Sequence, residues 1–425
     1  MANTPNVRFK GFTDDWEQRK LGEITNILSA SRVHKEEWKT EGVPFFRSSD
    51  VMAAFKGTSN EKVFISQELF EKLSAISGKP QQGDIFITGG GSIGTPYIVP
   101  NNKPLYSKDA DLIWVKKSEK HDPFYLYSYF VSPSFREYLL SISHIGTIAH
   151  YTIEQVKKTP VFFPHLGEQQ KIGQYFKELD HLIILHQRKC DEVKQLKKFM
   201  LPKMFPKSGE LIPEIRFAGF TGDWEQRKLS EVATMHARIG WQNLRTSEFL
   251  DSGDYMLITG TDFENGEINY ATCHYVERER YEQDKHIQVT NGSILITKDG
   301  TLGKVAYIQG LSMPATLNAG VFNVVIKDES EVDNKYLYQY LKAPFLMDYV
   351  DKKATGGTIK HLNQNILVDF PVDMPTKAEQ QVIGQYFDNL DNLITLHQRK
   401  CDNLKEVKRF MLQNMFPQKE KEKCI

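Results

Sequence analysis

The sequence lacks the features that mark several large classes of protein. Its four cysteines form no C-x-x-C pair and no Cys/His ligand spacing, so neither a disulfide framework nor a structural zinc site is expected. No window approaches 18 uncharged apolar residues, which argues against a membrane-spanning helix. The first residues, MANTPNVRFKGF, contain no apolar core of a secretory signal. These absences predict a cytoplasmic protein with no membrane segment.

Net charge is also lacking, because 54 Lys and Arg residues balance 54 Asp and Glu residues. A protein that coats DNA by itself usually carries a basic excess that neutralises phosphate. The balance argues against such a protein, although it allows local basic faces and partners that supply positive charge. With 425 residues, 40% of them hydrophobic, the chain is long enough for two or three domains with buried cores.

Catalytic motifs are missing as well. The chain has no G-x-x-x-x-G-K-[ST] loop, no H-E-x-x-H, no G-x-S-x-G and no N/D-P-P-Y/F signature. Glycine-rich loops do recur at 83–94 and 292–304, and their backbone amides could cradle phosphate. Strand-like runs flank both loops, which favours tight hairpins, with a hairpin tip facing nucleic acid as the alternative. We therefore expect a chain that is not catalytic by itself.

What the sequence does contain is a long internal repeat. Residues 8–24 read RFKGFTDDWEQRKLGEI, and residues 216–232 read RFAGFTGDWEQRKLSEV. Residues 168–206 and 379–417 are identical at 27 of 39 positions, whereas the stretches between these blocks differ almost throughout. A period near 210 residues is too long for a solenoid unit, so the repeat indicates a duplicated module.

The second repeated block predicts two long helices with coiled-coil seams. Apolar residues recur at heptad spacing in both copies, which is typical of helices that pack along a narrow seam. Thr376 and Glu379 form a T-x-x-E capping box, whereas the first copy has His165 at that place. A helix over 168–200 would be about 50 Å long. The seam residues are Ile172, Phe176, Leu179, Ile183, His186 and Val193 in the first helix, and Ile383, Phe387, Leu390, Ile394, His397 and Leu404 in the second.

Polar residues in this seam have two interpretations. His186 and His397 could be ligands or pH switches, but a histidine at a heptad core position more often sets the register of the helices. Cys190 and Cys401 are interpreted as core residues in the same way.

The stretches between the repeats predict α+β domains. Residues 83–90, 111–117, 292–300 and 320–327 read as strands, and residues 123–140 and 335–350 read as amphipathic helices interrupted by Pro133 and Pro344. We therefore expect two globular heads separated by a pair of long antiparallel coiled-coil helices around a pseudo-two-fold axis. The predicted division is head 1 at 1–165, a spacer helix at 166–212, head 2 at 213–376 and a second spacer helix at 377–425.

The combination of motifs resembles a known family, the specificity subunits of type I restriction-modification systems. The W-E-Q-R-K-L-x-E-[IV] openings at 16–24 and 224–232 are followed by glycine hairpins at 83–88 and 292–297. A G-T-I-x-H turn then stands at 146–150 and 357–361, and an E-Q-Q-x-I helix begins at Glu168 and Glu379. The resemblance covers essentially the whole chain.

The resemblance implies that the heads are target-recognition domains, each reading one half of a bipartite site on double-stranded DNA. It implies that the paired helices are a spacer ruler and dock two methyltransferase subunits, which the motor-endonuclease subunits join. S-adenosylmethionine, ATP and Mg are then expected on those partners, with no cofactor in this chain. A pseudo-two-fold protein with two unlike heads should bind a split, non-palindromic site.

Candidate DNA-reading residues lie where polar and basic side chains cluster in expected loops. Arg, Asn and Gln can contact base edges, whereas Lys mostly contacts phosphate. For any single residue the alternative is a solvated loop side chain. The candidates are Arg32, His34, Lys35, Arg47, Ser48, Ser49, Thr147, His150 and Tyr151 in head 1, and Arg238, Trp241, Gln242, Asn243, Arg245, Thr259, Thr261, Lys298, Lys304, Thr358, Lys360 and His361 in head 2. Trp16 and Trp224 are expected to anchor the heads to the helices.

Two other functions remain open at this point. One is a two-headed DNA-binding regulator or decoy that works without methyltransferase partners. The other is an enzyme that uses the duplicated glycine loops to bind nucleotides.

Overall fold

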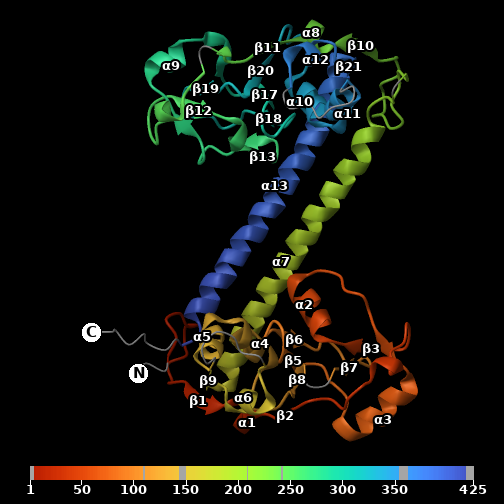
Figure 1. Cartoon of the computed structure of the whole chain (residues 1–425), viewed down its shortest axis with the longest axis vertical. Coiled ribbons are helices and arrows are strands. Elements are labelled where there is room, and N and C mark those ends of the chain that lie inside the picture. The colour runs from red at the N-terminus through yellow and green to blue at the C-terminus, as the bar shows by residue number, and fades with distance from the viewer. Residues whose placement is uncertain are drawn as a thin grey trace. The chain divides into compact units, whose positions relative to one another are not determined.

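The structure, a computed structural model, describes residues 4–108, 111–142, 150–207, 209–240, 243–353 and 362–417. It forms two compact units: unit 1 is residues 1–187 with 398–425, and unit 2 is residues 188–397. Each unit combines one mixed α+β head with part of both long helices (Figure 1). The four-segment division expected from the sequence stays a prediction.

Head 1 alternates short strands and helices. Its elements are β1 Glu17–Lys20, α1 Leu21–Ile24, β2 Ile27–Leu28, η1 Lys35–Glu37, β3 Val43–Phe46, α2 Ser48–Lys56, β4 Phe64–Ile65, α3 Gln67–Ser77, β5 Ile85–Thr88, β6 Pro96–Ile98, β7 Tyr106–Ser107, β8 Leu112–Val115, α4 Pro123–Val131, α5 Pro133–Ser141, α6 Ile153–Lys158 and β9 Pro160–Phe163.

Head 2 follows the same plan with additional short strands. Its elements are β10 Glu225–Lys228, α8 Leu229–Val232, β11 Ala233–His236, η4 Thr246–Glu248, β12 Met256–Ile258, η5 Gly260–Asp262, β13 Phe263–Glu264, β14 Glu267–Ile268, β15 His274–Tyr275, α9 Arg278–Glu282, η6 Lys285–Ile287, β16 Gln288–Val289, β17 Ile294–Thr297, β18 Val305–Tyr307, β19 Ala315–Leu317, β20 Val321–Ile326, α10 Asn334–Lys342, α11 Pro344–Lys353, α12 Gln364–Val368 and β21 Pro371–Met374.

Each head is built on a four-stranded sheet of the same topology. The strand order is β2-β8-β5-β6 in head 1 and β11-β20-β17-β18 in head 2, and the paired strands are antiparallel. A second sheet, three-stranded in head 1 and four-stranded in head 2, contains one parallel pair, β3 with β7 or β12 with β19. The strands and the proline-interrupted helices expected from the sequence are confirmed, because α5 and α11 begin at Pro133 and Pro344.

The repeated openings form a two-stranded ribbon with the strand that precedes each long helix. In head 1, β1 pairs antiparallel with β9, and in head 2, β10 pairs antiparallel with β21. Trp16 and Trp224, just before these strands, are almost fully buried and lie edge-on to Tyr125 and Tyr336. The repeated opening of each head therefore packs against the strand that leads into the long helix and against the first helix after the main sheet, α4 or α10.

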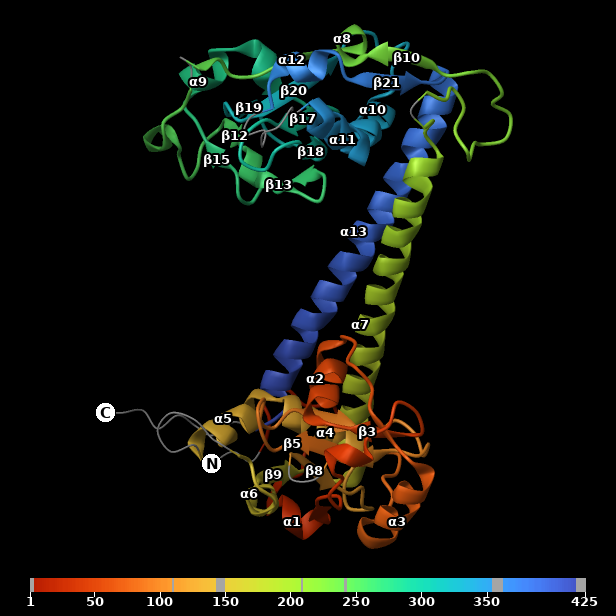
Figure 2. The ribbon, with the colours of Figure 1, turned by 45° about the vertical axis from the view of Figure 1, so that its right-hand side comes forward.

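The long helices are α7, Leu166–Met200, and α13, Lys377–Asn414. In unit 1 the thiol of Cys401 lies 3.9 Å from the carbonyl of Ile183, and Lys408 pairs with Asp180. Residue numbers thus rise along one helix as they fall along the other, so the helices are antiparallel; Figure 2 shows them from a second side. In unit 2 the thiol of Cys190 lies 3.8 Å from the carbonyl of Ile394 in the same arrangement.

The heptad seam expected from the sequence is confirmed by burial. All of its members are at least half-buried, and the first three of each helix, together with the two cysteines, are buried. The buried ones are Ile172, Phe176, Leu179, Cys190, Ile383, Phe387, Leu390 and Cys401, and the half-buried ones are Ile183, His186, Val193, Ile394, His397 and Leu404.

A buried arginine–glutamate pair marks the start of each long helix. Arg8 donates from Nε and Nη2 to the two carboxylate oxygens of Glu168, at 2.7 Å each. Arg216 binds Glu379 with the same two distances, and both glutamates are fully buried. The T-x-x-E capping box expected in the second copy forms only in part: the Glu379 backbone N–H donates to Thr376 Oγ1, while the Glu379 carboxylate is held by Arg216.

The residue after each glutamate connects the long helix to the next helix of the head. Gln169 accepts from the backbone N–H of Asp122, the N-cap of α4, and donates to the carbonyl of Pro164. Gln380 makes the same two bonds to Asp333, the N-cap of α10, and to Pro375. The E-Q pair therefore joins the opening, the last strand and the cap of a packed helix at one place.

Glycine at the sixth position of this block permits the closest approach of two helices. A Cβ on Gly173 would lie 2.2 Å from Asp122 Oδ1 and 2.7 Å from the backbone N of Tyr125. A Cβ on Gly384 would lie 2.7 Å from the backbone N of Tyr336. No side chain fits there without displacing α4 or α10.

We expect Gly173→Ala to destabilise unit 1 by about 1–3 kcal/mol, because the added methyl group forces α4 away from α7. Hydrogen exchange of the α4 amides in the full chain measures the change. Gly167→Ala on the same helix is the control, since its Cβ would meet nothing within 4 Å and alanine favours helix. Equal α4 protection in the Gly173→Ala variant and the wild type would contradict the close-approach argument.

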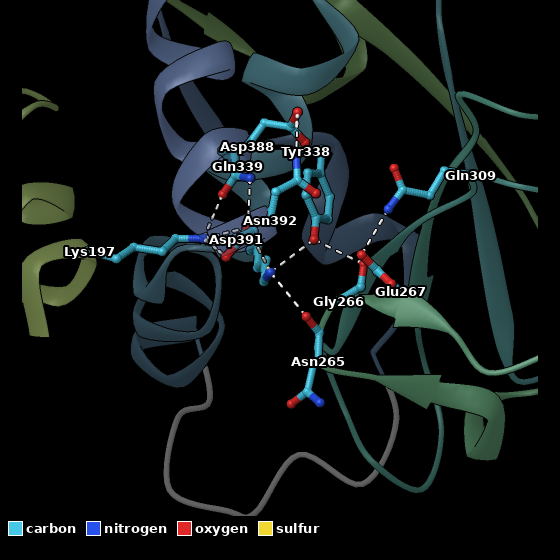
Figure 3. Close-up of polar contacts among 11 residues, drawn as sticks. Lys197, Asn265, Gly266, Glu267, Gln309, Tyr338, Gln339, Asp388, Asp391 and Asn392 are labelled. Atoms are coloured by element: carbon cyan, nitrogen blue, oxygen red, sulfur yellow. Dashed lines mark hydrogen bonds and ion pairs between the residues drawn. The ribbon is translucent and has the colours of Figure 1, made fainter. Parts of the chain in front are cut away.

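A polar network joins head 2 to the long helices (Figure 3). Asp391 of α13 accepts from Lys197 of α7 at 2.7 Å, from Gln339 of α10 at 2.9 Å and from Lys342 of α10 at 3.1 Å. Burial and the neighbouring Lys342 ammonium lower the pKa of Lys197 to about 8, against the raising effect of Asp391. One carboxylate thus holds two partly buried ammonium groups.

Two residues of the same network also bind the turn of the β13–β14 hairpin in head 2. Its two-residue turn, Asn265–Gly266, has positive φ at both positions, as a type I′ turn requires. Lys342 Nζ donates to the Asn265 carbonyl at 3.2 Å, and Tyr338 Oη donates to the Gly266 carbonyl at 2.9 Å. The hairpin therefore depends on α10, the helix that also contacts Asp391.

In unit 1 the equivalent carboxylate, Asp180, forms an ion pair with Lys408. Ser128 and Val131 of α4 stand where head 2 has Gln339 and Lys342, so α4 supplies no second ammonium group at this place. The two heads thus share a fold but differ in how firmly polar contacts hold them to the helices.

We expect Asp391→Ala to destabilise unit 2 by about 3 kcal/mol, because it leaves two partly buried ammonium groups without a carboxylate. Asp180→Ala is the matched variant in unit 1 and should cost about 1 kcal/mol, since it removes a single, more exposed ion pair. Hydrogen exchange of α10 and α4 measures the two effects separately. A larger loss in α4 than in α10 would contradict the expectation.

Candidate nucleic-acid interface

The glycine-rich loops are the tips of equivalent hairpins in the two heads. The loop 89–94 joins β5 to β6, and the loop 298–303 joins β17 to β18, so the hairpin interpretation is confirmed. In the neighbouring pairings, Thr88 lies opposite Leu112 and Thr297 lies opposite Val321. These registers align the two loops residue by residue, as TGGGSIG and TKDGTLG.

A buried threonine shapes each loop. Thr88 donates from Oγ1 to the Ser92 carbonyl and accepts from the Thr95 backbone N–H at 2.9 Å. Thr297 makes the corresponding bonds to the Thr301 carbonyl and the Lys304 backbone N–H, again at 2.9 Å. Both threonines are fully buried. The heads therefore present one loop backbone with two different sets of side chains.

The corner between a strand and a short helix lies beside each loop. In head 1 the corner follows β3, and Ser48 donates from Oγ to the carbonyl of Asp111 at 3.2 Å. That carbonyl also accepts from the Gly89 backbone N–H at 2.8 Å, so corner, loop and the start of β8 meet there. In head 2 the corner follows β12, and a Cβ on Gly260 would lie 3.3 Å from Thr297 Cγ2. We call this arrangement the loop cluster of each head.

The loop clusters gather part of the predicted site. In head 1 they contain Ser48, and His150, whose Nδ1 would lie 3.4 Å from a Cβ on Gly90. In head 2 they contain Thr259 and Thr261 of the corner together with Lys298 and Lys304 of the loop. Thr259 and Thr261 share a hydroxyl hydrogen bond of 2.7 Å, and Lys298 lies over the ring of Phe322.

Arg47 and Ser49 lie at the head 1 corner but already have protein partners. The Arg47 guanidinium donates to Asp50 at 2.9 Å and to the carbonyl of Glu61, and it lies over the Trp38 ring. Ser49 accepts from Asn60. The Arg47 side chain therefore holds the corner together, and a DNA contact from it stays a prediction.

Another group of candidates forms a second pair of equivalent turns outside the loop clusters. The His34 backbone N–H donates to Glu37 at 2.8 Å, and the Arg245 backbone N–H donates to Glu248 at the same distance. The side chains at these turns are exposed, and their contact with DNA stays a prediction. They are Arg32, His34, Lys35, Asn243 and Arg245.

The burial of two candidate residues contradicts their prediction as DNA contacts. Tyr151 is 1% exposed, and its hydroxyl is bonded to Thr159, while its backbone N–H donates to the Gly89 carbonyl. Arg238 is 2% exposed, and its guanidinium donates to the Leu317 carbonyl at 3.0 Å. Their side chains are packed inside the heads and cannot reach a base edge. The remaining candidates, Thr147, Trp241, Gln242, Thr358, Lys360 and His361, lie outside the described residues.

Two acidic residues of the loop clusters are not among the residues that the sequence predicts. Asp111 lies against Gly90 and forms an ion pair with Lys108, which precedes it by three residues. Asp299 stands in the loop of head 2, against Gly320. Aligning the strand pairs of the two heads with each other would have found both, because each sits one or two residues from a paired strand end.

Two further observations concern the described part of the chain. Within it, no three His, Cys, Asp or Glu side chains lie close enough together to hold a metal ion. None of its helices combines the length and apolar composition that crossing a membrane requires.

The fold and the loop clusters define a duplicated α+β protein with two similar heads on a pair of long helices. The chain belongs to the family described as the type I restriction modification DNA specificity domain, whose model matches residues 13–195 and 221–406. The expected family is therefore confirmed, and with it sequence-specific DNA recognition in a type I restriction-modification system.

Two known relatives match along most of their length. The chain is 20% identical to the type I restriction enzyme MjaVIII specificity subunit of Methanocaldococcus jannaschii, over 93% of this chain and 91% of that protein. It is 21% identical, with the same coverage, to the putative MjaX specificity subunit of that organism. The crystal structure of a type I restriction-modification S subunit from M. genitalium matches 98% of this chain and all of that one, with a TM-score of 0.60 and 15% identity. That structure supports the fold.

Proposed function

We propose that each head reads one half of a split DNA site. The observation that carries this proposal is the pair of loop clusters, which share backbone hydrogen bonds but carry TGGGSIG in one head and TKDGTLG in the other. One backbone with two sets of side chains presents two different patterns of donors and acceptors to base edges. The two half-sites should therefore differ in sequence while they are contacted in the same way.

The long helices α7 and α13 carry a second repeated surface, made of exposed apolar residues beside the seam. Unit 1 exposes Leu182, Leu185, Val407 and Phe410 by 39–58%. Unit 2 exposes the residues at the same repeat positions, Leu393, Leu396, Leu196 and Phe199, by 42–56%. We call each set an apolar quartet. Exposed apolar patches of this kind are typical of protein–protein contacts.

The proposed occupant of each quartet is a methyltransferase subunit, because the resemblance to specificity subunits implies one such partner for each half. Two copies of the quartet predict two copies of that partner. The chain itself is proposed to be non-catalytic, with S-adenosylmethionine, ATP and Mg bound by the methyltransferase and motor-endonuclease subunits. The balanced charge of this chain agrees with partners that supply part of the positive surface around the duplex.

Methylome sequencing of cells that express the chain with its methyltransferase subunit tests the proposed function. We expect one bipartite motif with modified bases in both halves and unlike half-sites. A single continuous palindrome would overturn the two-head proposal. Sequence-specific binding by the purified chain without any bound methyltransferase would instead support a two-headed regulator or decoy.

We expect Leu182→Asp with Leu185→Asp to remove about one of two bound methyltransferase copies, because two charges replace the apolar contact in unit 1 only. Native mass spectrometry of the purified complex counts the copies. Ile184→Asp is the control: Ile184 is 66% exposed on the same helix, but its repeat position is Thr395, so it belongs to no shared surface. An unchanged two-copy complex in the double variant would contradict the docking role of the quartet.

A further inference from the structure

The two loop clusters contain an exchanged glycine–aspartate pair. The Gly89 backbone N–H donates to the Asp111 carbonyl at 2.8 Å, and the Lys298 backbone N–H donates to the Gly320 carbonyl at 2.9 Å. With the strand registers, these bonds make Gly90 equivalent to Asp299, and Asp111 equivalent to Gly320. Head 1 thus has glycine in the loop and aspartate just before the facing strand β8, whereas head 2 has aspartate in the loop and glycine just before β20.

The exchange keeps one carboxylate in nearly the same place. A Cβ built on Gly90 would lie 3.5 Å from Asp111 Oδ1, so the head 1 carboxylate reaches the spot where the Asp299 side chain begins in head 2. A Cβ built on Gly320 would lie 3.7 Å from Asp299 Cβ and 3.9 Å from its Oδ2. Two aspartates at this spot would bring like charges together, which is unfavourable. Each head has one carboxylate and one glycine there.

A purely local structural role does not explain the exchange well. A side chain that caps a particular backbone group comes from a fixed position, whereas here the carboxylate comes from the hairpin loop in one head and from the residue before the facing strand in the other. What the heads share is the location of the acceptor, beside the tip of a hairpin. In head 1 the ion pair with Lys108 also offsets the repulsion that a carboxylate meets near phosphate.

We infer that Asp111 in head 1 and Asp299 in head 2 are base-reading residues, each accepting a hydrogen bond from an exocyclic amino group of a base in its half-site. The inference rests on the proposed function. An ionised carboxylate can only accept, and the amino groups of cytosine and adenine are the donors that bases offer in the major groove. Each carboxylate therefore selects a base with such a group at one position of its half-site.

The test compares Asp111→Asn and Asp299→Asn in the assembled complex, with methylation measured on a library of half-site variants. The amide keeps the shape of the side chain but adds a donor, so discrimination at one position should fall about five- to a hundredfold. Asp111→Asn should change only the half-site of head 1, and Asp299→Asn only that of head 2. Each variant is the internal control for the other, and the library shows whether the selected base is cytosine or adenine.

A second variant separates base reading from folding. Gly90→Asp with Asp111→Gly gives head 1 the arrangement of head 2, and both positions accept it, because Gly90 has no positive φ and a Cβ there meets nothing closer than 3.4 Å. This double variant should keep the base preference that Asp111→Asn loses. If Asp111→Asn is unstable, the double variant still tests whether the location of the carboxylate decides the preference.

Several results would overturn the inference. Unchanged preference in both asparagine variants would exclude base reading, and a uniform loss of methylation across the library would assign the carboxylate a structural role. Loss of the base preference in the exchanged double variant would show that location does not decide it. The proposed function fails differently, because the wild-type complex would then modify no split site at all.

Discussion

The constraint on which the rest of the structure depends is a carboxylate with no access to water at the start of each long helix. Glu168 and Glu379 are fully buried, so each needs a cation with hydrogen bonds to both oxygens, and Arg8 and Arg216 supply it. A buried pair of this kind adds little net stability compared with apolar packing, but its loss is costly. It therefore fixes which segments meet. The opening strand, the last strand of the head and the long helix are joined at this point.

Much of the fold could be predicted because its signals are local and periodic. The heptad seam at Ile172 and Leu179 needs no knowledge of the heads, since one buried stripe of a helix repeats at fixed spacing. Strands β5 and β17 are short apolar runs with glycine near both ends, and prolines mark where α5 and α11 begin. The duplication added a second copy of every signal, which made each element easier to recognise.

The candidate site was harder to predict because polarity does not determine exposure. Arg238 and Tyr151 are polar residues near expected loops, yet tertiary packing buries both and gives their polar groups internal partners. Arg47 is similarly engaged by Asp50. Asp111 and Asp299 do not align with each other in the repeated sequence. Only the strand registers show that their carboxylates have equivalent positions in the two heads. The network around Asp391 was missed because Lys197, Lys342 and the Asn265 turn meet only in three dimensions.

The discontinuity of unit 1 has a consequence for biosynthesis. Unit 2 is one continuous stretch, residues 188–397, whereas unit 1 needs residues 398–425 as well. Leu412, Met415 and Phe416 belong to the core of unit 1, and the backbone N–H of Val7 donates to the carbonyl of Asn414. During synthesis, head 1 is therefore made first but part of its core stays exposed until residues 398–425 are made. Head 2 can complete its core before that. The order of synthesis and the order of completion are opposite in this chain.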